Sequence, residues 1–262
     1  FHWVRIEDVP VIWEKLEANG LNTWDACGDV PRVILGSPVA GIAKDEIIDA
    51  TPAIRKIQKI VTDDEFQNLP RKFKTAISGN ARQDVVHEIN DLAFIGVEHP
   101  ELGPGFECYV GGGLSPNPML AQSLGAFVTL EQVPDVWANV VRIFRDYGYR
   151  RLRNRARLKF LVKEWGVEKF RQILEDDYLG YKLADGPKAP NNLVDRDHIG
   201  VHEQKDGNVY IGVKPTLGHM SGEQLIALAD LAEKYGVTDL RFTPFKDCLL
   251  YTSDAADDTP CV

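Results

Sequence analysis

The sequence predicts an α+β fold in which a mixed αβ domain is followed by a smaller αβ module. Between residues 73 and 111, short β-branched and aromatic runs alternate with Gly, Asn, Asp and Pro clusters, which is typical of strands. Residues 115 to 176 carry apolar side chains mainly at helical spacing. The turn-rich stretch 177 to 197 then precedes a strand–helix–strand pattern. The hydrophobic content of 44% is enough for one large core or two smaller ones.

The first expected element is a short amphipathic helix over residues 8 to 19, with Asp8 as its cap and Gly20 as its stop. A second helix is expected at about 44 to 61. Pro52 should break or restart it, so two shorter helices are equally compatible with the pattern.

The middle of the chain supplies the remaining elements of the larger domain. Three strands are expected at 73 to 78, 92 to 97 and 106 to 110. Four helices are expected near 117 to 125, 131 to 147, 153 to 164 and 166 to 177, with Gly148 and Gly166 between them.

The smaller module is expected to contain, in order, a strand at 209 to 213, a helix at 221 to 235 and a strand at 240 to 243. Asp206-Gly207 is a hairpin-type turn signal before the first of these strands. This order suits a ferredoxin-like αβ module that is cut short at its end.

Both ends of the chain are read as artificial boundaries. The chain opens with Phe1 rather than Met, directly before a helix, so we expect a natural N-terminus upstream. The run from Cys248 to Asp258 resembles translated sequencing adapter, so residues 247–262 are predicted to be a non-native tail. A natural acidic tail is the alternative.

Charge and cysteine content limit the class of protein. The net charge of −9 argues against a general binder of nucleic acid or anionic membranes, because such proteins need a broad positive field. No signal peptide or run of about 18 apolar residues is present, so no membrane partner is expected. The cysteines are scattered, with no spacing for zinc, an iron–sulfur cluster or a disulfide scaffold. We therefore expect no metal ligands here and a reducing, cytoplasmic setting.

Three cations, Arg71, Lys72 and Lys74, stand at the mouth of a predicted strand. Side chains two apart on a strand share a face, so the ammonium groups of Lys72 and Lys74 should repel each other unless an anion neutralises both. The alternative is an exposed edge strand that its lysines protect from aggregation.

A Gly- and Pro-rich turn between residues 26 and 41 delivers Arg32 into an apolar run. A guanidinium there needs a partner, which makes Arg32 a candidate clamp for an anion. A structural salt bridge to Asp29 or another carboxylate is the alternative.

Seven basic residues and one acid lie between Arg145 and Lys159. In an acidic protein this segment could contact cofactor carboxylates, an acidic partner or single-stranded nucleic acid. It could equally be a solvated helical face. Gly111-Gly112-Gly113, between a predicted strand and helix, could cradle an anion with backbone N–H groups, but fits neither dinucleotide nor Walker motifs, so a tight connection is the default.

Five motifs in order resemble the siroheme-dependent assimilatory sulfite and nitrite reductase family. They are Cys27-Gly28-Asp29-x-x-Arg32, Gly36-x-Pro38-x-x-Gly41, Asn68-Leu69-Pro70-Arg71-Lys72-Phe73-Lys74, Val110-Gly111-Gly112-Gly113-Leu114 and Arg145-Asp146-Tyr147-Gly148. The resemblance covers about residues 1 to 246. It implies the end of a first ferredoxin-like half-domain (1–25), a siroheme-binding domain (26–180), a linker (181–197) and the start of a second half-domain (198–246).

The resemblance also implies a function for the basic residues. Arg32, Lys72 and Lys74 would be catalytic ligands of the anion that binds the siroheme iron. Arg71, and with less support Arg150, Arg153 and Lys159, would contact siroheme carboxylates. A 4Fe-4S cluster, whose ligands lie outside this chain, would deliver electrons from ferredoxin, and a cytoplasmic monomer is expected.

Lys74 favours sulfite over nitrite, because nitrite reductases of this family tend to have asparagine at that position. Val33 and Ser37 depart from the family pattern of Asn after the arginine and Cys before the proline. The expected activity of the parent enzyme is the six-electron reduction of sulfite to sulfide, with the isolated fragment inactive. Nitrite reduction, a corrin-pathway oxidoreductase and a non-catalytic nucleic-acid or partner-binding protein are the alternatives.

Overall fold

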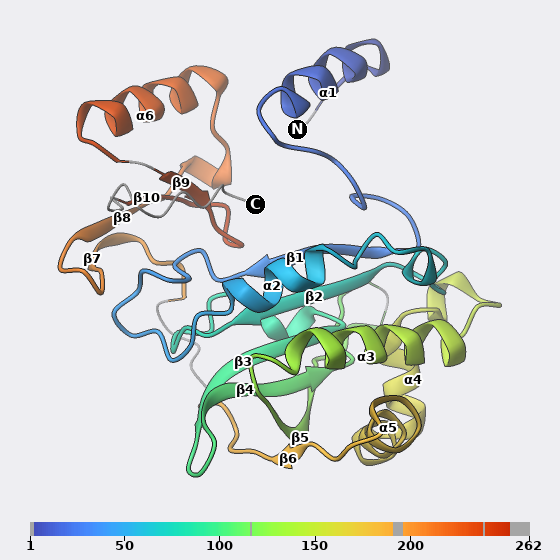
Figure 1. The fold of residues 1–262 in the computed structure, drawn as a ribbon. Helices are drawn as coiled ribbons and strands as arrows, with labels where there is room; N and C mark the ends of the chain where they lie inside the picture. The colour runs from blue at the N-terminus through green and yellow to red at the C-terminus, as the bar shows by residue number, and fades with distance from the viewer. Residues whose placement is uncertain (1–2, 116, 191–195, 238, 252–262) are drawn as a thin grey trace.

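A six-stranded mixed sheet forms the larger part of the structure, and a four-stranded antiparallel sheet forms the smaller part (Figure 1). The computed structural model describes residues 3–115, 117–190, 196–237 and 239–251. The predicted α+β class is therefore confirmed. Within these residues, no helix combines the length and apolar character needed to cross a bilayer.

The large sheet has the strand order β1-β2-β3-β4-β5-β6. Its strands are β1 (Pro31–Gly36), β2 (Phe73–Ser78), β3 (Leu92–His99), β4 (Gly103–Val110), β5 (Gln122–Val128) and β6 (Ala184–Asp185). The first three strands run parallel, and the others pair antiparallel. The first residues of β1, β2 and β3 consequently lie at the same end of the sheet.

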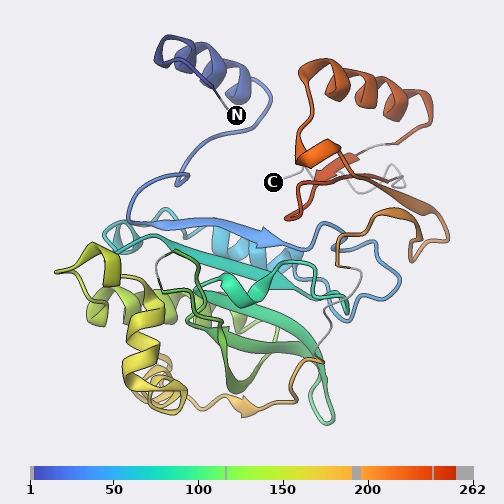
Figure 2. The same cartoon turned by 180° about the vertical axis from the view of Figure 1, so that it is seen from behind.

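Helices cover one face of this sheet and loops cover the other (Figures 1 and 2). The helices of this domain are α2 (Thr51–Gln58), α3 (Val133–Tyr147), α4 (Leu158–Trp165) and α5 (Val167–Ile173). Trp137 of α3 is completely buried in the main core and donates from its indole N–H to the Thr75 hydroxyl at 2.9 Å. A smaller apolar cluster, including Ala76, Val85 and Ile95, lies separate from this core. The sheet is therefore a buried platform that fixes its strand ends.

The small module has the strand order β7-β8-β10-β9 and one helix. Its elements are β7 (Gly200–Glu203), β8 (Val209–Val213), α6 (Gly222–Lys234), β9 (Asp239–Phe242) and β10 (Cys248–Tyr251). Ser221 and Gln224 form a capping box at the start of α6, which explains why this helix begins where the sequence predicted. The Asp206-Gly207 turn joins β7 to β8 as a hairpin.

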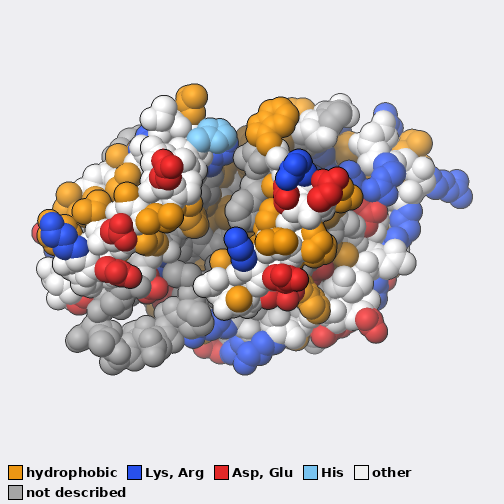
Figure 3. Space-filling model, turned by 90° about the horizontal axis from the view of Figure 1, so that it is seen from above, with side chains coloured by type: hydrophobic (Ala, Val, Ile, Leu, Met, Phe, Trp, Pro, Cys, Tyr) orange, Lys and Arg blue, Asp and Glu red, His pale blue; other side chains and the backbone are white. Residues whose placement is uncertain are grey.

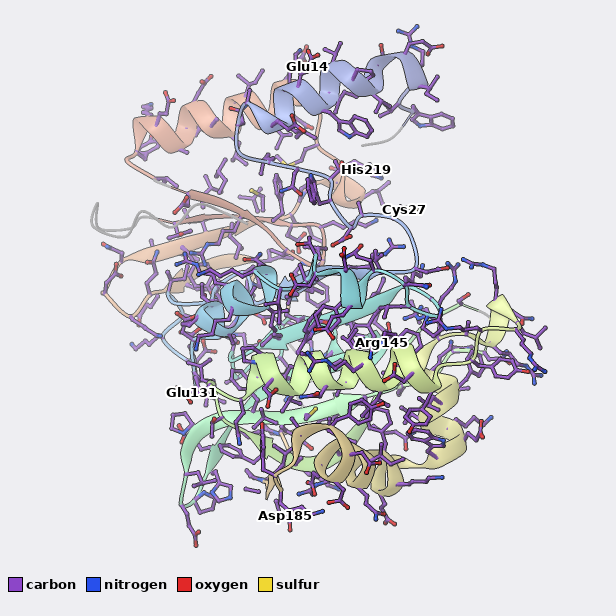
Figure 4. The ribbon with its side chains drawn as sticks, turned by 45° about the vertical axis from the view of Figure 1, so that its right-hand side comes forward. Glu14, Cys27, Glu131, Arg145, Asp185 and His219 are labelled. Carbon is purple, nitrogen blue, oxygen red and sulfur yellow. The ribbon has the colours of Figure 1, made fainter. Side chains whose placement is uncertain are left out.

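The N-terminal helix α1 (Val9–Glu17) lies on the same side of the large sheet as the small module (Figures 1 and 4). It buries none of its residues, and the Trp13 side chain is half exposed. On α6, Ile226 and Leu231 are also exposed. Seen from above, apolar side chains are distributed over both lobes of this face (Figure 3).

One helix prediction is wrong, and another holds only in part. Residues 117 to 125 were expected to be helical, but β5 begins at Gln122, and its buried side chains Leu124, Ala126 and Val128 follow the strand period of two. The predicted helix at 44 to 61 is confirmed only from Thr51 to Gln58. Pro52 lies in its first turn, where a missing N–H costs nothing, so Pro52 starts the helix rather than interrupting it.

The smaller module also continues beyond the predicted end at residue 246. Cys248–Tyr251 forms β10 and pairs with both β8 and β9 at the centre of the small sheet. We excluded this segment from the predicted fold because it resembles adapter sequence, but its continuous apolar run forms a strand between β8 and β9. The predicted tail beyond Tyr251 lies outside the described residues. A two-residue strand, β6, also lies within the predicted linker.

Candidate anion site

The candidate site lies at the end of the large sheet where the parallel strands β1, β2 and β3 begin. Pro31 pairs with Phe73, and Leu92 pairs with both Thr75 and Val110, so these strand ends are close neighbours. Arg32, Lys72 and Asp91 each lie within one residue of a strand start. The parallel arrangement thus explains why motifs far apart in the sequence meet here.

Lys72 is the centre of a cluster of positive charges. Burial lowers the pKa of its ammonium group, and the charges of Arg157, Lys74, Arg32 and Arg71 lower this pKa further. The three predicted anion ligands, Arg32, Lys72 and Lys74, are therefore brought into one electrostatic environment.

Lys72 and Lys74 flank the buried Phe73 and so share a face of β2. Because β2 pairs with β1 on one side and with β3 on the other, it is a central strand. The alternative of an edge strand protected by lysines is therefore wrong. Neither ammonium group makes a hydrogen bond or ion pair within the described part of the chain.

Arg32 closes the turn that precedes β1. Its guanidinium donates to the carbonyl oxygens of Ala26 and, at 2.9 Å, of Gly28. Its Nε is buried and has no hydrogen-bond partner among the described residues. The alternative salt bridge to Asp29 does not form. Instead the nearby Asp25 senses the charge of Arg32, although burial raises the pKa of that carboxyl.

Asp29 holds two other arginines. It accepts from Arg71 at 3.1 Å and from both terminal nitrogens of Arg153 at 2.8 and 3.1 Å. The hydrogen bond from Arg153 is the largest cause that lowers the pKa of Asp29. Two guanidinium groups share one carboxylate, so this cluster keeps an excess positive charge next to Lys72.

The other two predicted cofactor ligands bind backbone. Arg150 donates to the Asn68 carbonyl at 2.7 Å and to its side-chain oxygen at 3.2 Å. The Lys159 ammonium is buried and donates to the carbonyls of Gly113, Leu114 and Asn117 at 3.3, 2.8 and 2.9 Å. Burial lowers the pKa of Lys159. Its three donors are all used, so the structure assigns it a supporting contact.

The Gly111-Gly112-Gly113 segment is a tight connection. Its backbone N–H groups donate to the carbonyls of Asp91, Asn90 and Met119 at 2.8 to 2.9 Å. A Cβ at Gly112 would lie 2.5 Å from the backbone oxygens of Asn90 and Glu88. The anion-cradle reading of this segment is therefore wrong, because the N–H groups are already engaged.

The sequence reasoning missed one pair at this site. Asp91, whose side chain is completely buried, accepts from Arg157 Nε at 3.0 Å and Nη2 at 2.6 Å, and from the backbone N–H of Lys74 at 2.9 Å. A carboxylate directly before an apolar strand was the available signal, since it needs a buried partner. Arg153 and Arg157 are both paired and precede α4, so they do not form a solvated helical face.

Cys27 lies exposed on the segment between α1 and β1, and Arg145 lies on α3 (Figure 4). Arg145 pairs with Asp146 at 2.7 Å and with Glu65 at 3.4 Å, which ties α3 to the preceding loop. Cys27, Cys108 and Cys248 are free thiols. Among the described residues, no three His, Cys, Asp or Glu side chains form a group that could hold a metal.

Taken together, the site has more positive than negative charge. Its cations are Arg32, Arg71, Lys72, Lys74, Arg153 and Arg157. Its carboxylates are Asp25, Asp29 and Asp91. Such a site can bind a small oxyanion, and its arginines can also bind carboxylate groups of a larger ligand. A protonated lysine there can in addition donate a proton to the bound anion.

Comparisons with known proteins agree with this organisation. A family model described as the nitrite and sulphite reductase 4Fe-4S domain matches residues 27–183. A second, described as the nitrite/sulfite reductase ferredoxin-like half domain, matches residues 202–257. The chain is 55% identical over 259 residues to sulfite reductase (ferredoxin) 2 of Mycolicibacterium paratuberculosis, covering 98% of this chain and 46% of that protein.

A more distant relative is the assimilatory ferredoxin-dependent nitrite reductase of Haloferax mediterranei, at 37% identity over 92% of this chain and 44% of that protein. The structure of the Mycobacterium tuberculosis NirA protein matches with a TM-score of 0.92 and 52% identity, covering 98% of this chain and 47% of that one. The chain thus spans about half the length of the curated relatives it matches.

Proposed function

Since this chain belongs to the nitrite and sulphite reductase family, we propose that the protein which carries it catalyses the six-electron reduction of sulfite to sulfide. The observation that carries the proposal is the excess positive charge around Lys72. Four cations lower its pKa, and its ammonium group has no acceptor among the described residues. An oxyanion bound among Arg32, Lys72 and Lys74 would offset this repulsion.

The sulfite ion fits this proposal through its charge and its oxygen acceptors. The ammonium groups of Lys72 and Lys74 and the unpartnered Nε of Arg32 supply donors without a protein acceptor. As oxygen atoms leave sulfite, each needs protons to depart as water. Because its pKa is lowered, Lys72 gives up a proton more readily than an ordinary lysine does.

The same site fits a siroheme cofactor. Arg71 and Arg153 share the Asp29 carboxylate and retain guanidinium N–H groups for the carboxylates of the tetrapyrrole. When bound, siroheme supplies the iron to which the anion binds and through which electrons reach it. We place Arg150 at the margin of this contact, and Lys159 as the support of the Gly113 loop, because its donors are occupied.

We propose that electrons arrive from ferredoxin through a 4Fe-4S cluster, as the names of the family model and the relatives imply. The described residues offer no ligand group for a cluster, so we assign none of them to it and derive no step through it. The free, scattered thiols support a cytoplasmic setting.

Nitrite reduction is the second candidate, since the Haloferax mediterranei relative bears that activity in its name. Lys74 favours sulfite, because sulfite carries more negative charge and more oxygen acceptors than nitrite, and so gains more from a second ammonium group.

The test is an assay of the full-length protein with reduced ferredoxin and either anion. We expect faster turnover of sulfite than of nitrite, and Lys74→Asn should reduce that preference. Faster nitrite turnover by the unchanged protein would reverse our order. Absence of a Soret absorbance band after siroheme reconstitution would favour the non-catalytic alternative instead.

A further inference from the structure

We propose that Asp91 is a positioning residue of the anion site, because it holds both Arg157 and the backbone of Lys74, the residue two positions after Lys72. This inference rests on the proposed function. It identifies a carboxylate that touches neither anion nor cofactor but determines how the cations around them are arranged.

Asp91 connects three separate parts of the fold. It directly precedes β3, it accepts the backbone N–H of Lys74 on β2 at 2.9 Å, and it binds Arg157 just before α4 through two hydrogen bonds of 2.6 and 3.0 Å. No other described side chain joins the Lys74 strand to Arg157. Loss of Asp91 would therefore change the position of Arg157 relative to the strand that carries Lys74.

Burial makes this arrangement rigid. The Asp91 side chain is fully buried, and that of Arg157 is only 10% exposed. A guanidinium in such a place needs a carboxylate partner, and a bidentate pair fixes its plane as well as its position. Asp91 is thus the group that fixes the Arg157 guanidinium in this buried place.

Asp91 also sets the local electrostatic balance. Lys72 senses Arg32 from β1, Arg71 and Lys74 from its own segment, and Arg157 from the segment before α4. The charge of Asp91 acts on Arg157, on Lys74 and on Lys159. Removing this negative charge leaves Arg157 without its counter-charge and so strengthens the repulsion that Arg157 exerts on Lys72, so Lys72 should lose its proton at lower pH.

The experiment measures sulfate binding to the full-length protein by calorimetry over a series of pH values. Sulfate resembles sulfite but keeps one charge state throughout this range, so a change in affinity reports the protein. Binding should weaken as Lys72 loses its proton. In Asp91→Asn we expect this midpoint to move to lower pH and the affinity on the alkaline side to fall about fivefold.

A double variant distinguishes positioning from simple loss of structure. Asp91→Asn with Arg157→Gln replaces the ion pair by a neutral hydrogen-bonded pair of similar shape, which buried sites tolerate. It also removes the repulsion that Arg157 exerts on Lys72. The midpoint should therefore rise above the wild-type value, opposite in sign to the single variant.

Glu107→Gln is the matched control. Glu107 is equally buried, accepts hydrogen bonds from Tyr109 at 2.7 Å and from Ser123, and makes no ion pair within the described residues. Its loss should leave the midpoint unchanged even where it lowers stability.

Each outcome decides one claim. If the wild-type protein binds sulfate but Asp91→Asn keeps the wild-type midpoint, the inference about Asp91 is wrong. If Asp91→Asn does not fold, an unchanged midpoint in the double variant overturns the inference. If the wild-type protein binds no sulfate at any pH, the proposed anion site itself fails.

Discussion

The two ends of the parallel strands in the large sheet both contain buried polar groups, but these groups are partnered differently at each end. Where the parallel strands end, Asp84 accepts hydrogen bonds from Ser37 at 2.8 Å, Ser78 at 2.7 Å and His198 at 2.7 Å. The other ring nitrogen of His198 lies 2.9 Å from the Tyr210 hydroxyl. Where the parallel strands begin, the ammonium groups of Lys72 and Lys74 have no acceptor within the described chain.

The difference separates a structural joint from a candidate binding site. The Asp84 network is closed, because each buried group finds a protein partner, and it connects the large sheet to the small module through His198 and Tyr210. The Lys72 cluster is open, because its cations repel one another and the ammonium groups of Lys72 and Lys74 have no acceptor among the described residues. A closed network favours stability, whereas an open one needs a ligand to complete it.

The largest expected effect follows from removing the central cation. Lys72→Met should lower the rate of sulfite reduction about a thousandfold, because it removes both a ligand of the anion and a proton donor. Steady-state kinetics of the full-length enzyme check this. Lys59→Met, which changes an exposed lysine at the end of α2, should keep the wild-type rate, and an equal loss in both variants would contradict the assignment.

Opening the closed network should affect stability instead. Asp84→Ala should lower the free energy of unfolding by about 3 kcal/mol, because it leaves His198 and two serine hydroxyls buried without their acceptor. Urea unfolding measures the loss. The affinity of the remaining folded protein for sulfate should stay at the wild-type value. A large change in this affinity would show that the Asp84 network and the Lys72 cluster are not independent.

The tight glycine connection gives a smaller effect. Gly112→Ala should destabilise the protein by about 2 kcal/mol, because the new Cβ would lie 2.5 Å from two backbone oxygens. Thermal unfolding would show the difference. Gly222→Ala, where a Cβ meets nothing within 4 Å, should be neutral or slightly stabilising, so equal losses at both positions would remove this explanation.

The smallest effect concerns pH. Anion binding requires the charged form of Lys72, which is present below its pKa and is lost as pH rises through it. Since burial and neighbouring cations lower this pKa, affinity for sulfate should begin to fall at a pH below the ordinary lysine value of about 10.4. Binding that stays constant up to that value would show that Lys72 is not part of the site.

Sequence reasoning succeeded where structure is local. The strand at Phe73–Ser78 and the helix at Gly222–Lys234 were predicted because period, cap and turn signals lie within the segments themselves. The strands β1, β7 and β10 were missed, since each is short and depends on its neighbours for hydrogen bonds.

The site was predictable in part for the same reason. That Lys72 and Lys74 share a face follows from the strand period alone. The ion pairs depend instead on packing between distant segments. Asp29 pairs with Arg71 and Arg153, and Asp91 pairs with Arg157. No local pattern specifies which carboxylate a given arginine will find.

The most direct test of the account is a crystal structure of the full-length protein with bound sulfite. We predict that the anion lies within hydrogen-bonding distance of the ammonium groups of Lys72 and Lys74 and of the Arg32 guanidinium. Sulfite bound at another place, with these three side chains directed into solvent, would contradict the central claim that the open cluster of cations is the anion site.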